Sequence, residues 1–123
     1  MEEKSGIRPY IRVRLAGQEP FFGKGTVQIL HGIEETGSVR MACQQMGMSY
    51  SKGWKILKRM EQELGFAVVL RKQGGPGGGS TQVTEQGKEL LARFEAYERE
   101  VQESAAGAFE KYFSFNSENR KEV

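Results

Sequence analysis

The sequence predicts a mainly α-helical fold with a small amount of β-structure, and three observations support this prediction. Apolar residues recur with the period of an α-helix in four segments, 24–36, 39–46, 50–64 and 85–113. Short runs typical of β-strands stand before the first of these segments and between the third and the fourth. The chain has 123 residues, which is the size of one domain.

The composition excludes several classes of protein. No run approaches 18 apolar residues, and residues 1–6 lack the apolar stretch of a signal peptide, so we expect a cytoplasmic protein that does not span a membrane. A single cysteine, Cys43, allows no internal disulfide and no cysteine-rich metal site. There is one histidine, His31, and no aspartate, so the chain cannot assemble a Ser-His-Asp triad. We therefore expect a protein that is not an enzyme and that has no cofactor and no metal.

Charge is distributed unevenly along the chain. Residues 1–84 contain 12 Lys and Arg against 7 Glu, a net charge of +5. Residues 85–123 contain 6 Lys and Arg against 9 Glu, a net charge of −3. A basic body suggests a polyanionic partner, although an ordinary solvated surface explains so small an excess equally well.

The N-terminal part predicts a short β-hairpin. Residues 7–15 alternate between apolar and polar side chains, which predicts a half-buried strand. Pro9 favours the start of this strand or an edge position. Residues 16–19 have the composition of a turn, and residues 20–22 can return as a second strand.

Three helices follow, each with local signals for its ends. The first begins near Lys24 and ends at Gly37. Ser38 is a suitable N-cap for the second helix, which closes at Gly47. Ser49 is a suitable N-cap for the third helix.

The second and third helices form a candidate helix-turn-helix. Cys43, Gly47 and Gly53 place small residues where two helices would cross and a glycine where the turn needs a positive φ. The third helix could then enter the DNA major groove, which is about 12 Å wide. An ordinary three-helix bundle is the alternative that this spacing leaves open.

The third helix has an apolar face and a cationic face. Its apolar side and flank carry Gly53, Trp54, Leu57, Met60 and Leu64. Its opposite side carries Ser51, Lys52, Lys55, Lys58, Arg59 and Gln62. No acidic residue lies between positions 51 and 60, which favours contact with a polyanion over the three-helix-bundle alternative.

A glycine-rich segment, 74–80, separates two strand candidates at 67–72 and 81–84. No Lys follows these glycines as a P-loop requires, and no helix follows directly as a dinucleotide fold requires. The segment therefore predicts a β-hairpin wing, with Arg71 and Lys72 at its base. A solvated turn without any contact to a ligand is the alternative.

The final segment predicts one long helix over 85–113, capped by Thr84. At 1.5 Å per residue this helix is about 42 Å long, so a body this small cannot cover its whole apolar stripe. We expect the same stripe of a second copy to cover it, which makes the chain a homodimer. The predicted interface residues are Leu90, Phe94, Tyr97, Val101, Ala105, Ala108 and Tyr112. We expect residues 1–84 to form the DNA-binding domain, 85–113 the dimerisation helix and 114–123 a disordered tail.

Several of these motifs together resemble a known family. They are Gly37-Ser38, Met46-Gly47-Met48-Ser49-Tyr50, Trp54, Leu64-Gly65, the glycine run at 74–79 and Thr84-x-x-Gly87-x-x-Leu90-Leu91. This combination, over about residues 20–95, resembles the N-terminal domain of the molybdate-dependent transcriptional regulators, the ModE family. The run from Leu57 to Gly65 is also similar to LysR-type helices.

The resemblance implies a winged helix-turn-helix that dimerises through long helices and binds operator DNA. Gly53 departs from the family, which usually has Ala there, and Val83 and Ser80 are milder departures. In the full-length family, molybdate-binding domains follow the long helix, and the present sequence has none after residue 113. We therefore do not expect direct molybdate binding.

The favoured hypothesis is a dimeric transcriptional regulator that binds double-stranded DNA with helix 50–64 in the major groove and wing 74–80 on the backbone. The predicted DNA-binding residues are Arg40, Ser49, Tyr50, Ser51, Lys52, Lys55, Arg59, Arg71, Lys72, Gly77, Gly78, Gly79 and Ser80. The alternative is a protein-interaction or dimerisation module on the same scaffold, with only weak DNA binding. An enzyme is the least favoured hypothesis.

Overall fold

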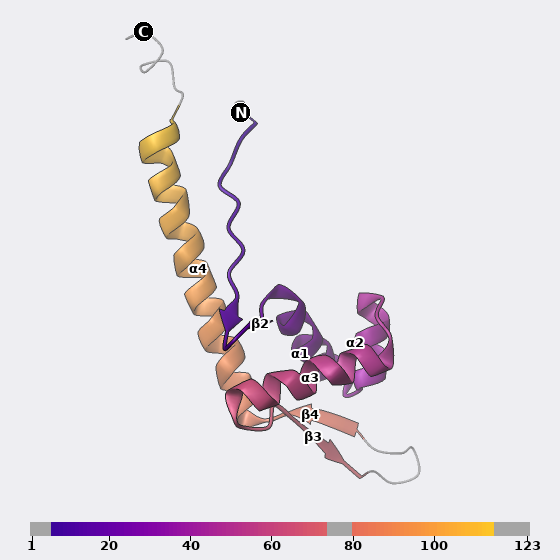
Figure 1. Cartoon of the computed structure of the whole chain (residues 1–123). Coiled ribbons are helices and arrows are strands. Elements are labelled where there is room, and N and C mark those ends of the chain that lie inside the picture. Colours follow the sequence, from indigo (N-terminus) through magenta and orange to yellow (C-terminus); the bar gives the residue numbers. More distant parts are fainter. Residues whose placement is uncertain (1–5, 74–79, 115–123) are drawn as a thin grey trace, which may run out of the picture. The chain divides into compact units, whose positions relative to one another are not determined.

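The computed structural model describes residues 6–73 and 80–114 of the chain (Figure 1). Over these residues it confirms a mainly α-helical winged helix-turn-helix with a short N-terminal hairpin and a long C-terminal helix. The elements are β1 Leu15–Ala16, β2 Pro20–Phe22, α1 Lys24–Thr36, α2 Val39–Met46, α3 Tyr50–Leu64, β3 Val69–Lys72, β4 Ser80–Val83 and α4 Glu85–Phe113. Strands β1 and β2 form one antiparallel pair, and β3 and β4 form another. The predicted tail at 114–123 lies outside the described residues except for Ser114.

The strand predicted over 7–15 is wrong for most of its length. Only Leu15 and Ala16 pair with the returning strand, opposite Phe22 and Pro20 respectively. Residues 7–14 have no neighbouring strand in the described part of the chain, so their backbone cannot form a ladder. Alternating side chains are therefore not sufficient to form a strand, which also needs a neighbouring strand to pair with.

The helix ends lie where the local signals predicted them. Gly37 and Gly47 adopt positive φ values of 71° and 70° and end α1 and α2. The Ser38 hydroxyl accepts a hydrogen bond from Met41 N at 3.0 Å. The Ser49 hydroxyl accepts one from Lys52 N at 3.1 Å, which fixes the start of α3.

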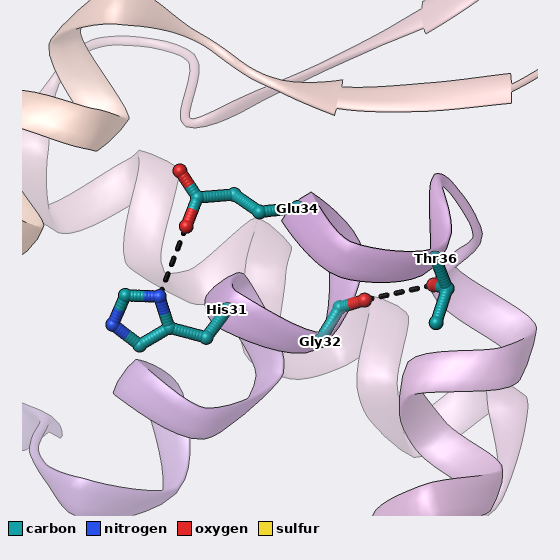
Figure 2. Close-up of polar contacts among 4 residues, drawn as sticks. All are labelled: His31, Gly32, Glu34 and Thr36. Atoms are coloured by element: carbon teal, nitrogen blue, oxygen red, sulfur yellow. Dashed lines mark hydrogen bonds and ion pairs between the residues drawn. The ribbon is translucent and has the colours of Figure 1, made fainter.

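Helix α1 carries two local polar contacts and one close packing contact with α2. Figure 2 shows His31 Nδ1 2.9 Å from Glu34 Oε1, one turn further along the helix. It also shows the Thr36 hydroxyl donating to the Gly32 carbonyl oxygen at 2.8 Å. A Cβ atom on Gly32 would lie 2.9 Å from the Cβ of Ala42, so α1 and α2 cross closely at these two positions.

The chain divides into two compact units. One comprises residues 13–94, and the other comprises residues 1–12 with 95–123. The boundary between the units falls within α4, after Phe94. The first turns of α4 therefore belong with the helix-turn-helix.

The unit at 13–94 contains the hydrophobic core. Its largest fully buried side chains come from β2, from the three short helices and from the residue before β3: Phe22, Ile29, Leu30, Ile33, Cys43, Leu57, Met60 and Val68. The Phe94 ring meets the Phe22 ring edge-on, with centroids 5.0 Å apart, and so attaches the start of α4 to the hairpin.

The other unit pairs the N-terminal segment with the later part of α4. Gln102 Nε2 donates a hydrogen bond to the Ile11 carbonyl oxygen at 2.9 Å. The Phe109 and Phe113 rings stack with centroids 5.3 Å apart. Over the described residues, none of the helices combines the length and the apolar character that a bilayer crossing requires.

Candidate nucleic-acid interface

Helix α3 presents a cationic face to solvent. Ser51, Lys52, Lys55 and Lys58 are exposed, while the opposite side of the helix packs into the core through Gly53, Leu57 and Met60. The sequence contains no carboxylate between positions 51 and 60 to neutralise these lysines. The helix therefore offers a row of uncompensated positive charge on a rigid element.

Arg59 is bonded to a residue that is distant in the sequence and that the sequence analysis did not connect with it. Its Nη2 donates a hydrogen bond to the Glu19 carbonyl oxygen at 3.3 Å and lies 3.9 Å from a Glu19 carboxylate oxygen. Glu19 belongs to the turn between β1 and β2, forty residues earlier in the chain. Arg59 thus braces the first hairpin. Lys52 and Lys55, the other predicted DNA-binding cations of α3, form no such bond within the described part of the chain.

The crossing of α2 and α3 positions this face. Cys43 on α2 is buried, and its Sγ lies against Gly53 of α3 where a side chain would otherwise stand. Burial raises the pKa of the Cys43 thiol above its ordinary value, and the nearby Arg40 guanidinium opposes that rise. The thiol therefore stays protonated at neutral pH and acts as a small apolar group.

A hollow of about 520 Å³ lies beside the start of α3. It is bordered by the turn between α1 and α2, by Tyr50 and Trp54 of α3, and by the ends of β3 and β4. The cations on its wall are Arg40, Arg71 and Lys72, and none of the described residues that line it is acidic. We call this space the basic hollow.

Two arginines of the basic hollow are stacked on aromatic rings. The guanidinium carbon of Arg40 lies 4.2 Å from the centre of the Tyr50 ring. The guanidinium carbon of Arg71 lies 4.8 Å from the centre of the Trp54 ring, and its Nη2 donates to the Tyr50 hydroxyl at 3.1 Å. These contacts hold both cations in place without neutralising them.

The sequence singled out Arg40, Tyr50, Arg71 and Lys72 separately, and the structure brings them together around one space. The sequence placed Trp54 on the apolar side and flank of the third helix, and it is partly buried in the wall of the hollow. Residues 37–40 and 69–72 are about thirty positions apart in sequence, so only the tertiary fold shows that they meet.

The serines and glycines predicted to contact DNA differ in where they lie. Ser49 is exposed, but its hydroxyl already serves as the N-cap of α3. Ser80 is exposed at the start of β4 and lines the basic hollow. Gly77, Gly78 and Gly79 lie outside the described residues.

The base of the β3–β4 hairpin is fixed by the predicted Thr84 cap and by contacts of Glu61 and Thr84 that sequence reasoning missed. A Glu61 carboxylate oxygen on α3 accepts hydrogen bonds from Val68 N at 2.8 Å and Val69 N at 3.4 Å. The Thr84 hydroxyl donates to the Ala67 carbonyl oxygen at 2.7 Å and accepts from Gly87 N at 2.9 Å. A carboxylate just before a helix end, followed seven residues later by a buried β-branched run, is a weak signal that could have suggested the first contact.

The solvent exposure of the apolar stripe predicted on α4 changes along the helix. Leu90 is partly buried against the core, and Phe94 is 2% exposed within it. Val101 and Ala105 are partly buried, whereas Tyr97, Ala108 and Tyr112 are exposed. In the single chain, Phe94 is thus already covered, and the open part of the stripe begins at Tyr97.

Residues 26–88 of the chain match the family described as bacterial regulatory helix-turn-helix protein, lysR family. This match spans half of the chain and covers α2, α3 and the β3–β4 hairpin. The chain belongs to this family. Among the described residues, no group of three or more His, Cys and Glu side chains is arranged to hold a metal ion.

Curated relatives are consistent with a ModE-like helix-turn-helix region. The chain is 33% identical over 76 residues to the molybdenum transport protein ModE of Azotobacter vinelandii, covering 62% of this chain and 28% of that protein. It is 34% identical over 79 residues to the molybdenum-pterin-binding protein MopB of Rhodobacter capsulatus, covering 64% and 29%. It is 28% identical over 78 residues to the DNA-binding transcriptional dual regulator ModE of Escherichia coli (strain K12), covering 63% and 30%. The chain therefore spans about 30% of the length of these relatives.

Proposed function

We propose that this chain is a dimeric transcriptional regulator that binds double-stranded DNA in a sequence-specific manner. Helix α3 enters the major groove with Ser51, Lys52 and Lys55 toward the bases and phosphates. The β3–β4 wing, with Arg71 and Lys72 at its base, lies on the backbone. The name of the Escherichia coli relative, a DNA-binding transcriptional dual regulator, agrees with this role.

The observation that carries the proposal is the lysine face of α3. It is exposed, it lacks any acidic residue between positions 51 and 60, and the opposite side of the helix is anchored in the core. A helix held in this way can present side chains to base edges at a fixed depth. Each Lys that meets a phosphate releases a counterion and makes binding steeply dependent on salt.

The homodimer is supported by the distribution of exposed apolar side chains. Of the eight large hydrophobic residues exposed among the described residues, six belong to the unit formed by residues 1–12 and 95–123. They are Ile7, Tyr10, Ile11, Tyr97, Tyr112 and Phe113. Exposed apolar side chains gathered in one small unit are typical of a protein interface. A second copy meets the same surface about a two-fold axis, as in most homodimers.

The experiment compares two charge-neutralised double variants by fluorescence anisotropy on duplex DNA. Lys52→Gln with Lys55→Gln removes two cations from the α3 face. Lys88→Gln with Arg93→Gln removes two exposed cations from the start of α4. We expect the first pair to weaken binding at least tenfold and to lower the slope of log K against log salt by about 1.8 per protomer, because each phosphate contact contributes about 0.9. Equal affinities of the two double variants would contradict the assignment of α3.

A docking role for the same scaffold is the second candidate, and the exposed Tyr97 and Tyr112 of acidic helix α4 favour it. It predicts weak DNA binding without sequence preference. Selection of one preferred duplex sequence from a random pool would exclude it, because a docking module has no means of reading bases.

A further inference from the structure

The basic hollow has a charge that its own residues do not balance. Arg40, Arg71 and Lys72 line it, and none of its lining residues is acidic. Helix α2 also begins at this wall, and its first backbone N–H groups, at Val39 and Arg40, favour an anion. Three cations and a helix start around one concave space are an arrangement for an anionic group.

The two arginines are already held in position before any ligand arrives. Each guanidinium has five N–H donors, and stacking on a ring leaves those donors at its edge available. Arg40 is held by the Tyr50 ring, and Arg71 is held by the Trp54 ring and the Tyr50 hydroxyl. Preorganised side chains lose less conformational entropy on binding, so they bind an anion more tightly than free surface cations do.

A buried donor in the same wall also lacks an acceptor. Trp54 Nε1 is inaccessible to solvent and has no hydrogen-bond partner among the described residues. Because this atom is closed to solvent it does not open into the hollow, so the indole serves as a reporter beside the site and is not counted among its ligands. The volume of the hollow, about 520 Å³, is also within the range of ligand-binding clefts, roughly 300–1,000 Å³.

We infer that the basic hollow binds a single phosphate group, with Arg40 and Arg71 as its principal ligands and Lys72 as an additional cation. The shared chemistry belongs to two sources, a phosphodiester of the DNA backbone and a free phosphate-bearing small molecule. If DNA is the source, the inference rests on the proposed function and names the place where one backbone phosphate is seated. If the source is free phosphate, the inferred site does not depend on the proposed function.

Trp54 is the one tryptophan of the chain, so its indole N–H gives a single cross-peak in a ¹H–¹⁵N correlation spectrum. The full chain is titrated with sodium phosphate at constant ionic strength, with sodium chloride as the balancing salt. A parallel titration uses a short duplex. A saturable movement of the indole peak with either probe supports the inference. Arg40→Gln and Arg71→Gln should each weaken that response about tenfold, the loss of one charged hydrogen bond. Arg93→Gln, an exposed arginine on α4, should leave it unchanged.

The two probes separate the possible sources. Movement with phosphate identifies a site for free phosphate groups, and movement with the duplex alone identifies a backbone phosphate. No saturable movement with either probe, or equal responses in Arg71→Gln and Arg93→Gln, overturns the inference. Fluorescence anisotropy on the same duplex measures DNA binding and so tests the proposed function independently. Tight DNA binding with a stationary indole peak leaves that function intact, and a phosphate response without DNA binding leaves the site intact.

Discussion

The Sγ atom of Cys43 occupies the space that a side-chain carbon on Gly53 would need. The two residues lie on α2 and α3, at the crossing that sets the angle of the proposed recognition helix. The family that the sequence resembles usually has Ala at the second position. In this chain Cys43 of α2 fills the contact, and Gly53 of α3 leaves room for it.

Gly53→Ala should destabilise the protein. Alanine favours a helix over glycine by about 1 kcal/mol, but its Cβ would overlap Cys43 Sγ, and overpacking of a core typically costs about 1–3 kcal/mol. We expect Gly53→Ala combined with Cys43→Ala to recover most of the loss. Gly107→Ala, at a helical glycine with open space around it, serves as the control and should be neutral or stabilising. Urea unfolding of the natural chain, Gly53→Ala, Cys43→Ala, the double variant and Gly107→Ala measures these differences, and additive effects of the two core changes would argue against the contact.

The Cys43 thiol should make stability fall at alkaline pH. Because burial raises its pKa in the folded protein, the unfolded chain loses the thiol proton first as the pH rises. The contribution is therefore complete below the pKa of an unfolded thiol, about 8.5, and declines above it. Urea unfolding at pH 7 and at pH 9.5 should show a larger drop for the natural chain than for Cys43→Ala. Equal drops would mean that the thiol is not protected by burial.

Glu61→Ala should loosen the base of the wing. The substitution leaves Val68 N and Val69 N without their carboxylate acceptor, and an unsatisfied buried donor costs about 1–3 kcal/mol. Glu61→Gln keeps an acceptor oxygen and should lose much less. Hydrogen exchange at the Val68 amide measures the effect directly. Exchange at the same rate in the natural chain and in Glu61→Ala would show that this contact does not hold the strand.

Ala108→Glu and Ala106→Glu test the proposed dimer with a matched pair. Both alanines are exposed on α4 in the single chain, and they point in nearly opposite directions around the helix. Only Ala108 lies in the apolar stripe, so Ala108→Glu should place a charge in the interface and shift the protein toward monomer. Sedimentation equilibrium over a range of protein concentrations reads the change. Identical dissociation constants for the two variants would exclude this face of α4.

The helices were predictable because their ends are set by local chemistry. Ser38, Ser49 and Thr84 accept hydrogen bonds from backbone N–H groups three residues further on, and Gly37 and Gly47 adopt the positive φ that ends a helix. Each of these signals lies within a few residues of the boundary it marks. The long helix at 85–113 followed from its cap and its continuous apolar spacing.

The strand predicted over 7–15 failed because a strand depends on a neighbour that sequence alternation does not guarantee. The same reason explains the contacts that were missed. Arg59 meets Glu19 across forty residues, and Arg71 meets Tyr50 across twenty-one. The basic hollow exists only where α2, α3 and the wing come together, so its cations could be named individually from the sequence but not assembled.

The measurement that tests the central proposal most directly is selection of bound fragments from a pool of random duplex DNA, followed by anisotropy titration of the selected sequence across a salt series. The account predicts a palindromic sequence with half-sites about one helical turn apart, bound at least 10³-fold more tightly than random DNA. It also predicts a steep decrease in affinity with salt. Recovery of no preferred sequence, with weak and uniform binding to all duplexes, would contradict it.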